Sequence, residues 1–304
     1  MKKVLITGGS GLIGRHLVPM LKEKDYSVRL LSRRPLHDNG TPSYLWDPEK
    51  GEIDPRALDE VDFIIHLAGL NIGEKRWTPS RKKLIVDSRV RSGELLLDRI
   101  KSRKQKLQAF ITASAIGYYG SLSSDTVFEE DAPAANDFLG QTCQQWESIA
   151  DRFEEFGVRP VKVRTGVVLA KKGGALSKLS QPVRLGVGAL LGSGKQYMPW
   201  IHIDDLCRII IHILEDPKLS GAYNAVAPEH CSNSELTRKI ARQLRRPLWL
   251  PRVPAGLLRL IFGEMSVMLL EGSRVSSEKV REAGFSFHYP ELEKALADLI
   301  GPKK

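Results

Sequence analysis

The chain has 304 residues, of which 42% are hydrophobic and 27% charged, and its formal net charge is +10. These proportions are typical of a soluble globular protein, and the length suits one large α/β domain or a main domain with a smaller partner. The basic residues form no nucleic-acid motif, and no apolar run is long enough to span a bilayer, so we expect neither a nucleic-acid nor a membrane partner. Three cysteines without metal-ligand spacing indicate a reducing compartment, which predicts a cytoplasmic location and no metal site.

The N-terminal residues have the pattern of a strand, a glycine-rich turn and a helix. The apolar run Val4 to Ile6 is followed by Gly8, Gly11 and Gly14, and then by helical spacing of apolar residues. Glycines at such a turn let the backbone approach a pyrophosphate, and the positive end of the helix points at it. The pattern therefore predicts a dinucleotide site at Gly8, Ser10, Gly11, Leu12, Ile13 and Gly14.

A second strand, expected over residues 27–31, leads directly into Ser32, Arg33 and Arg34. In a doubly wound fold this position selects the cofactor. An acidic residue here binds the ribose hydroxyls of NAD, whereas guanidinium groups pair with the 2′-phosphate of NADP. Two arginines and no acid favour NADP(H), with Ser32, Arg33 and Arg34 as its contacts.

The next predicted strands cover residues 44–46 and 61–69, and a helix covers about 79–101. Ligands lie at the carboxyl ends of parallel strands. We therefore expect further cofactor contacts at these strand ends and in the helix, from Trp46, Asp47, Leu67, Ala68, Gly69 and Ser88. For Asp47, an ordinary turn before Pro48 is the alternative.

A strand over residues 109–114 ends at Ser114 and runs into a Gly/Tyr loop that contains Tyr118. A serine in this place is positioned to face the nicotinamide, so Ser114 and Tyr118 are the candidate catalytic residues. A polar loop, a helix over about 138–156 and a strand over 160–168 follow, and Arg164 in that strand completes the predicted cofactor set.

Beyond residue 169 the sequence becomes glycine-rich, with a helix capped by Asp204 or Asp205, a late strand at 221–226, a helix at 234–244 and a mostly helical end. Strands that alternate with helices predict an α/β fold, a doubly wound, mainly parallel Rossmann sheet with a smaller, mostly helical C-terminal lobe. We place the cofactor domain at 1–170 with 203–227 returning to it, and the substrate lobe at 171–202 and 228–304. The apolar segment 257–270 suits either a lobe core or a contact in a homodimer.

Together, these motifs resemble the extended short-chain dehydrogenase/reductases, in particular the sugar-nucleotide epimerase/dehydratase group. The matching segments are 7–14, 66–69, Ser114 with Tyr118, and 200–205. Segments 32–35, 76–78, 88–90, 251–254, 263–265 and 283–287 resemble an atypical "epimerase family protein" or SulA-like subgroup with its own C-terminal extension. In the family, the segment containing Lys195, His202 and Asp204 forms the substrate cleft.

One departure from the family matters for function. The family uses Tyr-x-x-x-Lys on a helix, because residues four apart share a face and the lysine both holds the ribose and lowers the tyrosine's pKa. Aligning on Glu147 puts Leu139 and Cys143 at these positions, and neither can do this chemistry. We therefore expect an NADP(H)-binding oxidoreductase or epimerase with a small, anionic or nucleotide-linked substrate, or alternatively a non-catalytic NADPH sensor.

Overall fold

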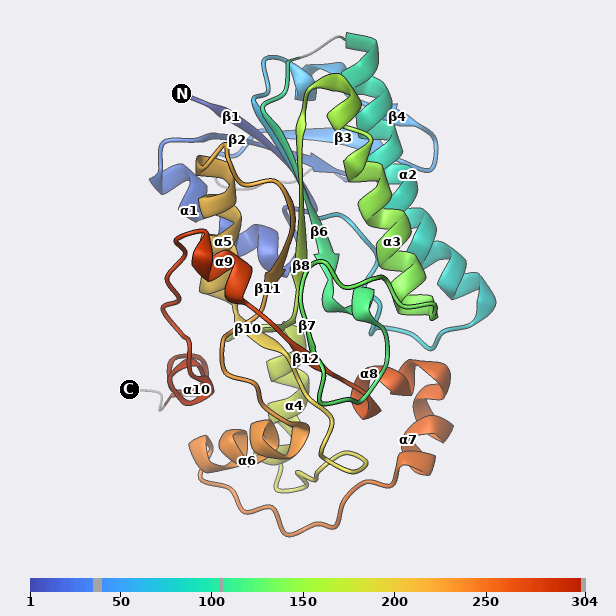
Figure 1. The fold of residues 1–304 in the computed structure, drawn as a ribbon, viewed down its shortest axis with the longest axis vertical. Helices are drawn as coiled ribbons and strands as arrows, with labels where there is room; N and C mark the ends of the chain where they lie inside the picture. Colours follow the sequence, from blue (N-terminus) through green and yellow to red (C-terminus); the bar gives the residue numbers. More distant parts are fainter. Residues whose placement is uncertain (35–39, 104–105, 302–304) are drawn as a thin grey trace.

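The computed structural model describes residues 1–34, 40–103 and 106–301. Its centre is an eight-stranded sheet in the order β11-β8-β6-β5-β1-β2-β3-β4, in which every pair is parallel except β3 with β4 (Figure 1). The predicted doubly wound fold is confirmed. The strands of this sheet are β1 Lys3–Thr7, β2 Ser27–Ser32, β3 Ser43–Asp47, β4 Glu52–Ile53, β5 Phe63–His66, β6 Ala109–Ala115, β8 Arg159–Thr165 and β11 Gly221–Ala225.

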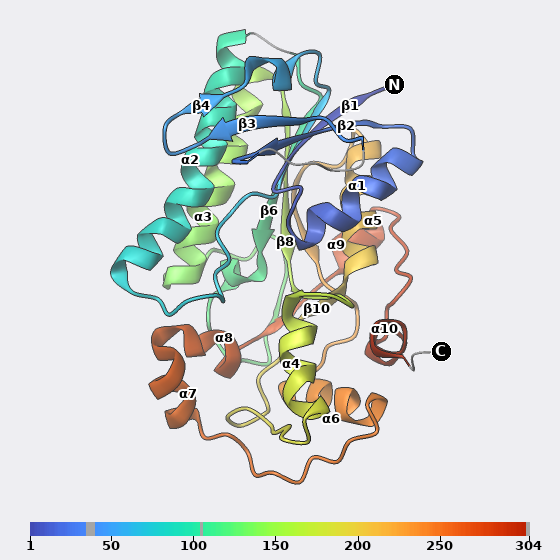
Figure 2. The same cartoon turned by 180° about the vertical axis from the view of Figure 1, so that it is seen from behind.

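Helices cover both faces of the sheet because its strands are apolar on both sides. Along β1, Val4 and Ile6 face one core with helices α1 and α5, while Leu5 faces the other core with α2. Figures 1 and 2 show α1 and α5 on one side and α2 and α3 on the other. Their bounds are α1 Leu12–Glu23, α2 Pro79–Arg103, α3 Phe138–Asp151 and α5 Ile203–Glu215.

The prediction of one long strand over 160–168 is wrong, because the strand is interrupted at Gly166. A Cβ atom on Gly166 would lie 2.7 Å from the carbonyl oxygen of Pro199, so the backbone passes here too closely for a side chain. Beyond this point β9 (Val167–Leu169) leaves the large sheet and pairs in parallel with β10 (Trp200–His202). The helix predicted over 138–156 is also shorter, since α3 ends at Asp151 and a separate 3₁₀ turn follows at Glu154–Phe156.

A smaller group of elements lies beyond the carboxyl ends of the strands (Figure 1). Helix α4 begins at Gly174, which like its N-cap Gly173 has a positive φ, and it lies between two segments, 171–174 and 185–194, whose glycines indicated loops. The cap of α5 is His202, which accepts a hydrogen bond from the Asp204 N–H, so the predicted Asp204 or Asp205 cap is wrong. The remaining elements are α4 Gly174–Arg184, α6 Asn233–Gln243, α7 Ala255–Phe262, α8 Val267–Leu270, α9 Glu278–Glu282, α10 Leu292–Ile300 and the pair β7 Val127–Phe128 with β12 Arg274–Val275.

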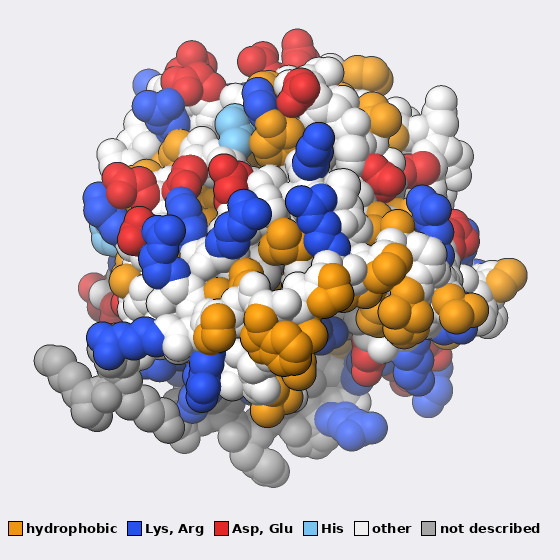
Figure 3. Space-filling view, turned by 90° about the horizontal axis from the view of Figure 1, so that it is seen from below, with side chains coloured by type: hydrophobic (Ala, Val, Ile, Leu, Met, Phe, Trp, Pro, Cys, Tyr) orange, Lys and Arg blue, Asp and Glu red, His pale blue; other side chains and the backbone are white. Residues whose placement is uncertain are grey.

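Helix α7 presents apolar side chains to solvent. Leu257, Leu260 and Ile261 are 45%, 73% and 51% exposed, so most of this helix is not the core of the lobe. Figure 3 looks onto this end of the molecule, where hydrophobic side chains form a band bordered by Lys and Arg. A contact with a second copy of the chain stays a prediction for this surface. Among the described residues, no helix combines the length and apolar composition needed to cross a membrane.

Candidate functional site

The glycine turn between β1 and α1 forms a cradle with no room for side chains. Gly8 has φ +70°, and a Cβ on it would lie 2.8 Å from the backbone carbon of Leu67. A Cβ on Gly14 would lie 2.5 Å from the Cα of Gly9, so this glycine lets α1 pack directly on the turn. Gly11 differs, since a Cβ there would meet only the Gly8 carbonyl oxygen, at 3.1 Å. Its outer side is open, as the predicted approach of a pyrophosphate requires.

The first turn of α1 can bind an anion. Gly11 is its N-cap, with extended backbone, and no side chain of the described residues caps the helix. The N–H groups at the start of a helix lack partners within the helix and carry its positive dipole end. Ser10 and Gly11 are exposed, and Leu12 and Ile13 are partly exposed. These residues fit the diphosphate part of a dinucleotide.

Buried hydrogen bonds lock the ends of β1 and β5 together. The Thr7 hydroxyl lies 2.8 Å from Nδ1 of His66 and accepts hydrogen bonds from the N–H groups of Leu67 and Ala68. Burial lowers the pKa of His66 to about 4, so the imidazole is neutral and its Nδ1 can accept the Thr7 proton. The segment Leu67–Gly69 is thereby held against the glycine turn, with Gly69 exposed at the site.

Arg33 and Arg34 lie at the carboxyl end of β2, beside the glycine turn. Strand β2 pairs with β1 up to Thr7 and Leu31, which brings the two strand ends side by side. Both arginines are exposed, and neither forms an ion pair within the described chain. Ser32 accepts a hydrogen bond from the Arg34 N–H at 3.4 Å. The two guanidinium groups are thus available to a phosphate, as their position in the sequence predicts.

Three other predicted cofactor contacts have partners of their own. Trp46 is only 6% exposed, lies in the α2-side core and meets His66 edge-on. The Asp47 carboxylate accepts the Glu49 N–H at 3.0 Å, so the geometry favours the turn interpretation. The Ser88 hydroxyl accepts the Leu70 N–H at 3.1 Å and supports the strand-end loop from below.

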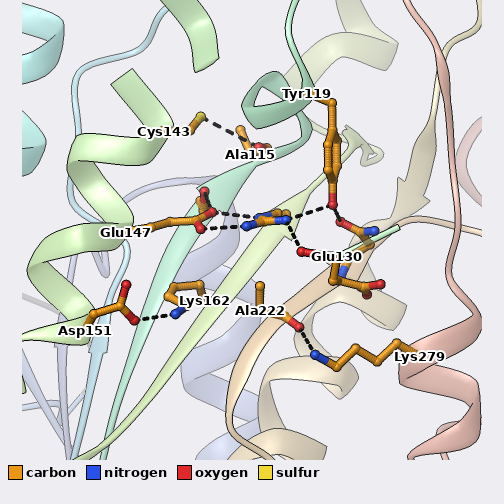
Figure 4. Close-up of polar contacts among 12 residues, drawn as sticks. Ala115, Tyr119, Glu130, Cys143, Glu147, Asp151, Lys162, Ala222 and Lys279 are labelled. Carbon is orange, nitrogen blue, oxygen red and sulfur yellow. Dashed lines mark hydrogen bonds and ion pairs between the residues drawn. The ribbon is translucent and has the colours of Figure 1, made fainter. Parts of the chain in front are cut away.

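Arg164 belongs to a buried polar network rather than to the open cradle. Its guanidinium donates to both carboxylate oxygens of Glu147 at 2.9 Å, to the Tyr119 hydroxyl at 3.0 Å and to the Glu130 carbonyl at 2.9 Å. Glu147 from α3 and Tyr119 approach the guanidinium from different sides (Figure 4). Arg164 is 3% exposed, and its guanidinium is directed to these partners within the protein.

Ser114 is the end of this network that faces the candidate catalytic loop. Its hydroxyl donates to Oε1 of Glu147 at 2.6 Å, and the side chain is 3% exposed. Tyr118 is half-buried, and its ring lies 3.5 Å from the Arg164 guanidinium carbon. The structure therefore brings Ser114 and Tyr118 together around one Glu–Arg pair. Sequence reasoning used Glu147 only as an alignment landmark and did not connect it to Arg164.

The network holds its charges in fixed states. Burial opposes the charge on Arg164, but the hydrogen bonds and charge of Glu147 outweigh it, and the pKa of Arg164 is raised. Burial raises the pKa of Tyr119 to about 12 despite the neighbouring Arg164. Tyr119 therefore stays protonated near neutral pH and donates a hydrogen bond to the side-chain oxygen of Asn224, 2.7 Å away. These groups orient Ser114 but have no accessible proton to exchange with a substrate.

Leu139 and Cys143 face the loop after Ser114. A Cβ on Gly117 would lie 3.3 Å from the Cβ of Leu139 and 3.9 Å from the sulfur of Cys143. The Cys143 thiol donates to the Ala115 carbonyl at 3.7 Å. Both side chains thus line the place that the resemblance assigns to the tyrosine and lysine.

The Cys143 thiol is expected to be inert. Burial, with a smaller contribution from the charge of Glu147, raises its pKa to about 12, so on the order of one thiol in ten thousand is ionised at pH 8. We expect no alkylation of Cys143 by iodoacetamide at pH 8 in the native chain and complete alkylation in urea, both read by peptide mass spectrometry. Rapid alkylation of the native chain would instead show that Cys143 is a reactive thiolate.

His202, from the predicted cleft segment, and Trp77, from the segment 76–78, have structural roles. His202 is 1% exposed, stacks on Tyr289 at 3.8 Å and caps α5. Trp77 is 7% exposed and donates to the Ile72 carbonyl at 2.9 Å, while its ring packs edge-on against Phe138. Lys195 and Arg76 are exposed and remain open to an anionic ligand.

Comparison with known families agrees with this geometry. Residues 4–226 match the NAD dependent epimerase/dehydratase family. The chain belongs to this family. Residues 253–299 match a second family, described as a domain of unknown function (DUF1731), in the region where the sequence indicated a subgroup-specific extension. The predicted resemblance is confirmed in both parts.

Related proteins cover the whole chain. It is 38% identical over 303 residues to epimerase family protein SH2119 of Staphylococcus haemolyticus, covering 99% of each chain. It is 36% identical to epimerase family protein SDR39U1 of Mus musculus, over 98% of this chain and 99% of that protein. The crystal structure of human epimerase family protein SDR39U1 with NADPH superposes with a TM-score of 0.87 at 34% identity, covering 98% of both chains.

Proposed function

We propose that this protein is an NADP(H)-dependent oxidoreductase or epimerase that acts on a small molecule. One observation carries the proposal: a side-chain-free glycine cradle lies beside two exposed arginines, Arg33 and Arg34, that lack ion-pair partners within the described chain. That combination suits a dinucleotide with a phosphate on its adenosine ribose. The NADPH in the crystal structure of human SDR39U1 agrees with this choice.

Different residues of the cradle would bind different parts of the cofactor. The uncapped first turn of α1 would hold the diphosphate, with Gly11 giving backbone access. Arg33 and Arg34 would hold the 2′-phosphate, and the backbone of Ala68 and Gly69 would line the path toward Ser114. When bound, the cofactor supplies or accepts a hydride.

Proton transfer needs a donor other than the residues at the usual positions. Leu139 has no ionisable proton, and the raised pKa of Cys143 keeps its thiol neutral. The Ser114 proton is directed to Glu147 at 2.6 Å, which leaves the lone pairs of its oxygen to accept from a substrate hydroxyl. Tyr118, half-buried beside Ser114, is the proton donor that we propose.

The substrate would lie between the strand ends and the C-terminal lobe. In this arrangement residues 1–170 and 203–227 bind the cofactor, and 171–202 with 228–304 contact the substrate. The exposed Lys195 and Arg76 favour an anionic or nucleotide-linked molecule. The alternative from the sequence is a non-catalytic NADPH sensor, and its only support is the presence of Leu139 and Cys143 at the usual catalytic positions. The relatives named above are called epimerase family proteins.

Turnover assays test the catalytic part of this proposal. We expect NADPH oxidation with at least one member of a panel of carbonyl compounds and nucleotide sugars, followed at 340 nm. Ser114→Ala should lower that rate by about a hundredfold or more, in the range of other groups that act in proton transfer. It should leave NADPH affinity unchanged, because Ser114 lies beyond the cradle. NADPH binding without turnover across the panel would favour the sensor.

A further inference from the structure

Arg89, on α2, contacts the strand-end loop of the cofactor cradle. A Cβ on Gly69 would lie 3.2 Å from its guanidinium carbon. The guanidinium donates to the Leu70 carbonyl at 3.1 Å and to the Ile85 carbonyl at 2.9 Å. These contacts hold the side chain next to the exposed Gly69, along which the cofactor is predicted to lie.

The charge of Arg89 has no carboxylate partner within the described chain. A guanidinium has five N–H donors, and the two carbonyls use two of them. Burial lowers the pKa of Arg89 to about 10, and the nearby charge of Arg81 acts in the same direction. A largely buried cation that lacks an anion is costly, since two carbonyls replace only part of its lost hydration. The site is therefore electrostatically incomplete without an anionic or hydroxyl-rich ligand.

Arg89 also lies beside the position where the family has its lysine. Its guanidinium sits over the ring of Trp146 at 4.9 Å, and Trp146 is one helical turn beyond Cys143 on α3. The charge of Arg89 is near enough to Cys143 to oppose part of the rise that burial causes in the pKa of its thiol. A cation from α2 thus lies against α3, one helical turn from position 143.

We propose that Arg89 takes over the cofactor-holding role of the missing lysine, by donating hydrogen bonds to the ribose on the nicotinamide side of the cofactor. The inference rests on the proposed NADP(H) binding and assigns a residue to the half of the cofactor that the glycine turn and Arg33 do not reach. It also separates two tasks that the family combines in one pair. Arg89 holds the ribose, whereas Leu139 leaves proton transfer to another group.

Binding of a whole and a half cofactor tests this role. The probes are NADPH and adenosine 2′,5′-bisphosphate, which keeps the 2′-phosphate end and lacks the nicotinamide ribose. We expect Arg89→Met to lower the affinity for NADPH about ten- to hundredfold, the range for the loss of hydrogen bonds from a charged group. Affinity for the bisphosphate should stay within about twofold. Both are measured by calorimetry.

A second variant shows whether charge at this place is what matters. In the Arg89→Met background, Cys143→Lys restores the lysine of the wider family and should recover most of the lost NADPH affinity. Arg89→Lys serves as the conservative variant if Arg89→Met melts at a lower temperature than the parent chain. Its NADPH affinity should then lie between those of Arg89→Met and the parent.

Three results would overturn the inference. If Arg89→Met lowers the affinities for NADPH and for the bisphosphate equally, Arg89 only supports the loop at Leu70. Unchanged NADPH affinity in Arg89→Met means that the guanidinium does not touch the cofactor, and a Cys143→Lys variant that rescues nothing argues against a shared place. If the parent chain binds neither probe, the proposed function itself fails, which is a separate outcome.

Discussion

Replacing Arg164 with methionine is expected to destabilise the folded chain by about 3–5 kcal/mol, the cost of removing one partner of a buried ion pair. Methionine fills similar space but leaves the Glu147 carboxylate, 5% exposed, without its two guanidinium bonds. The Tyr119 hydroxyl and the Glu130 carbonyl lose a donor as well. A typical domain is stable by only 5–15 kcal/mol, so this loss is a large fraction of the total.

Urea unfolding followed by circular dichroism measures this loss. The matched control is Arg281→Met, which removes an exposed pair with Glu278 and should cost about 0–1 kcal/mol. The double variant Arg164→Met with Glu147→Gln should recover part of the loss, because it leaves no buried charge without a partner. A loss below about 1 kcal/mol in Arg164→Met would show that water reaches Glu147 and that the network does not fix the Ser114 end.

The cofactor-binding half of the fold can be predicted because its sequence signals depend only on nearby residues. The apolar run at Val4 to Ile6, the glycines after it and the arginines after β2 each act within a few residues of one another. The pairing of β1 with β2 then follows from the strand–helix–strand alternation. Gly8, Gly11 and Gly14 are each required for a different steric reason, and each reason agrees with the place of the glycine in the sequence pattern.

What the sequence does not reveal depends on distant partners. The break at Gly166 is set by the Pro199 carbonyl, 33 positions away, and nothing near Gly166 signals it. The role of Arg164 is similar. An arginine among valines in a buried strand must find a counter-charge, yet only the packing of α3 on the sheet selects Glu147.

The cofactor preference is expected to respond strongly to Arg33→Asp. In the parent chain, NADPH should bind at least about tenfold tighter than NADH, because two exposed guanidinium groups meet the extra phosphate. Aspartate removes one of them and adds a repelling charge, so NADPH affinity should fall by about a hundredfold or more, or roughly 3 kcal/mol. NADH lacks the phosphate, and its affinity should stay unchanged or rise, since a carboxylate here can accept from ribose hydroxyls.

Fluorescence titration with both cofactors at two salt concentrations separates this effect from a general change of charge. Arg238→Asp makes the same change of charge on an exposed position of α6, in the lobe far from the end of β2 (Figure 1). It should leave the NADPH-to-NADH ratio intact, because screening weakens charge effects beyond about 10 Å at 0.1 M salt. If Arg33→Asp weakens both cofactors equally, the substitution has disturbed the cradle, and the arginines do not discriminate the phosphate. If NADPH weakens alone, the guanidinium recognises the 2′-phosphate itself, and the family's NAD-dependent fold has been adapted to NADP(H) at this single strand end.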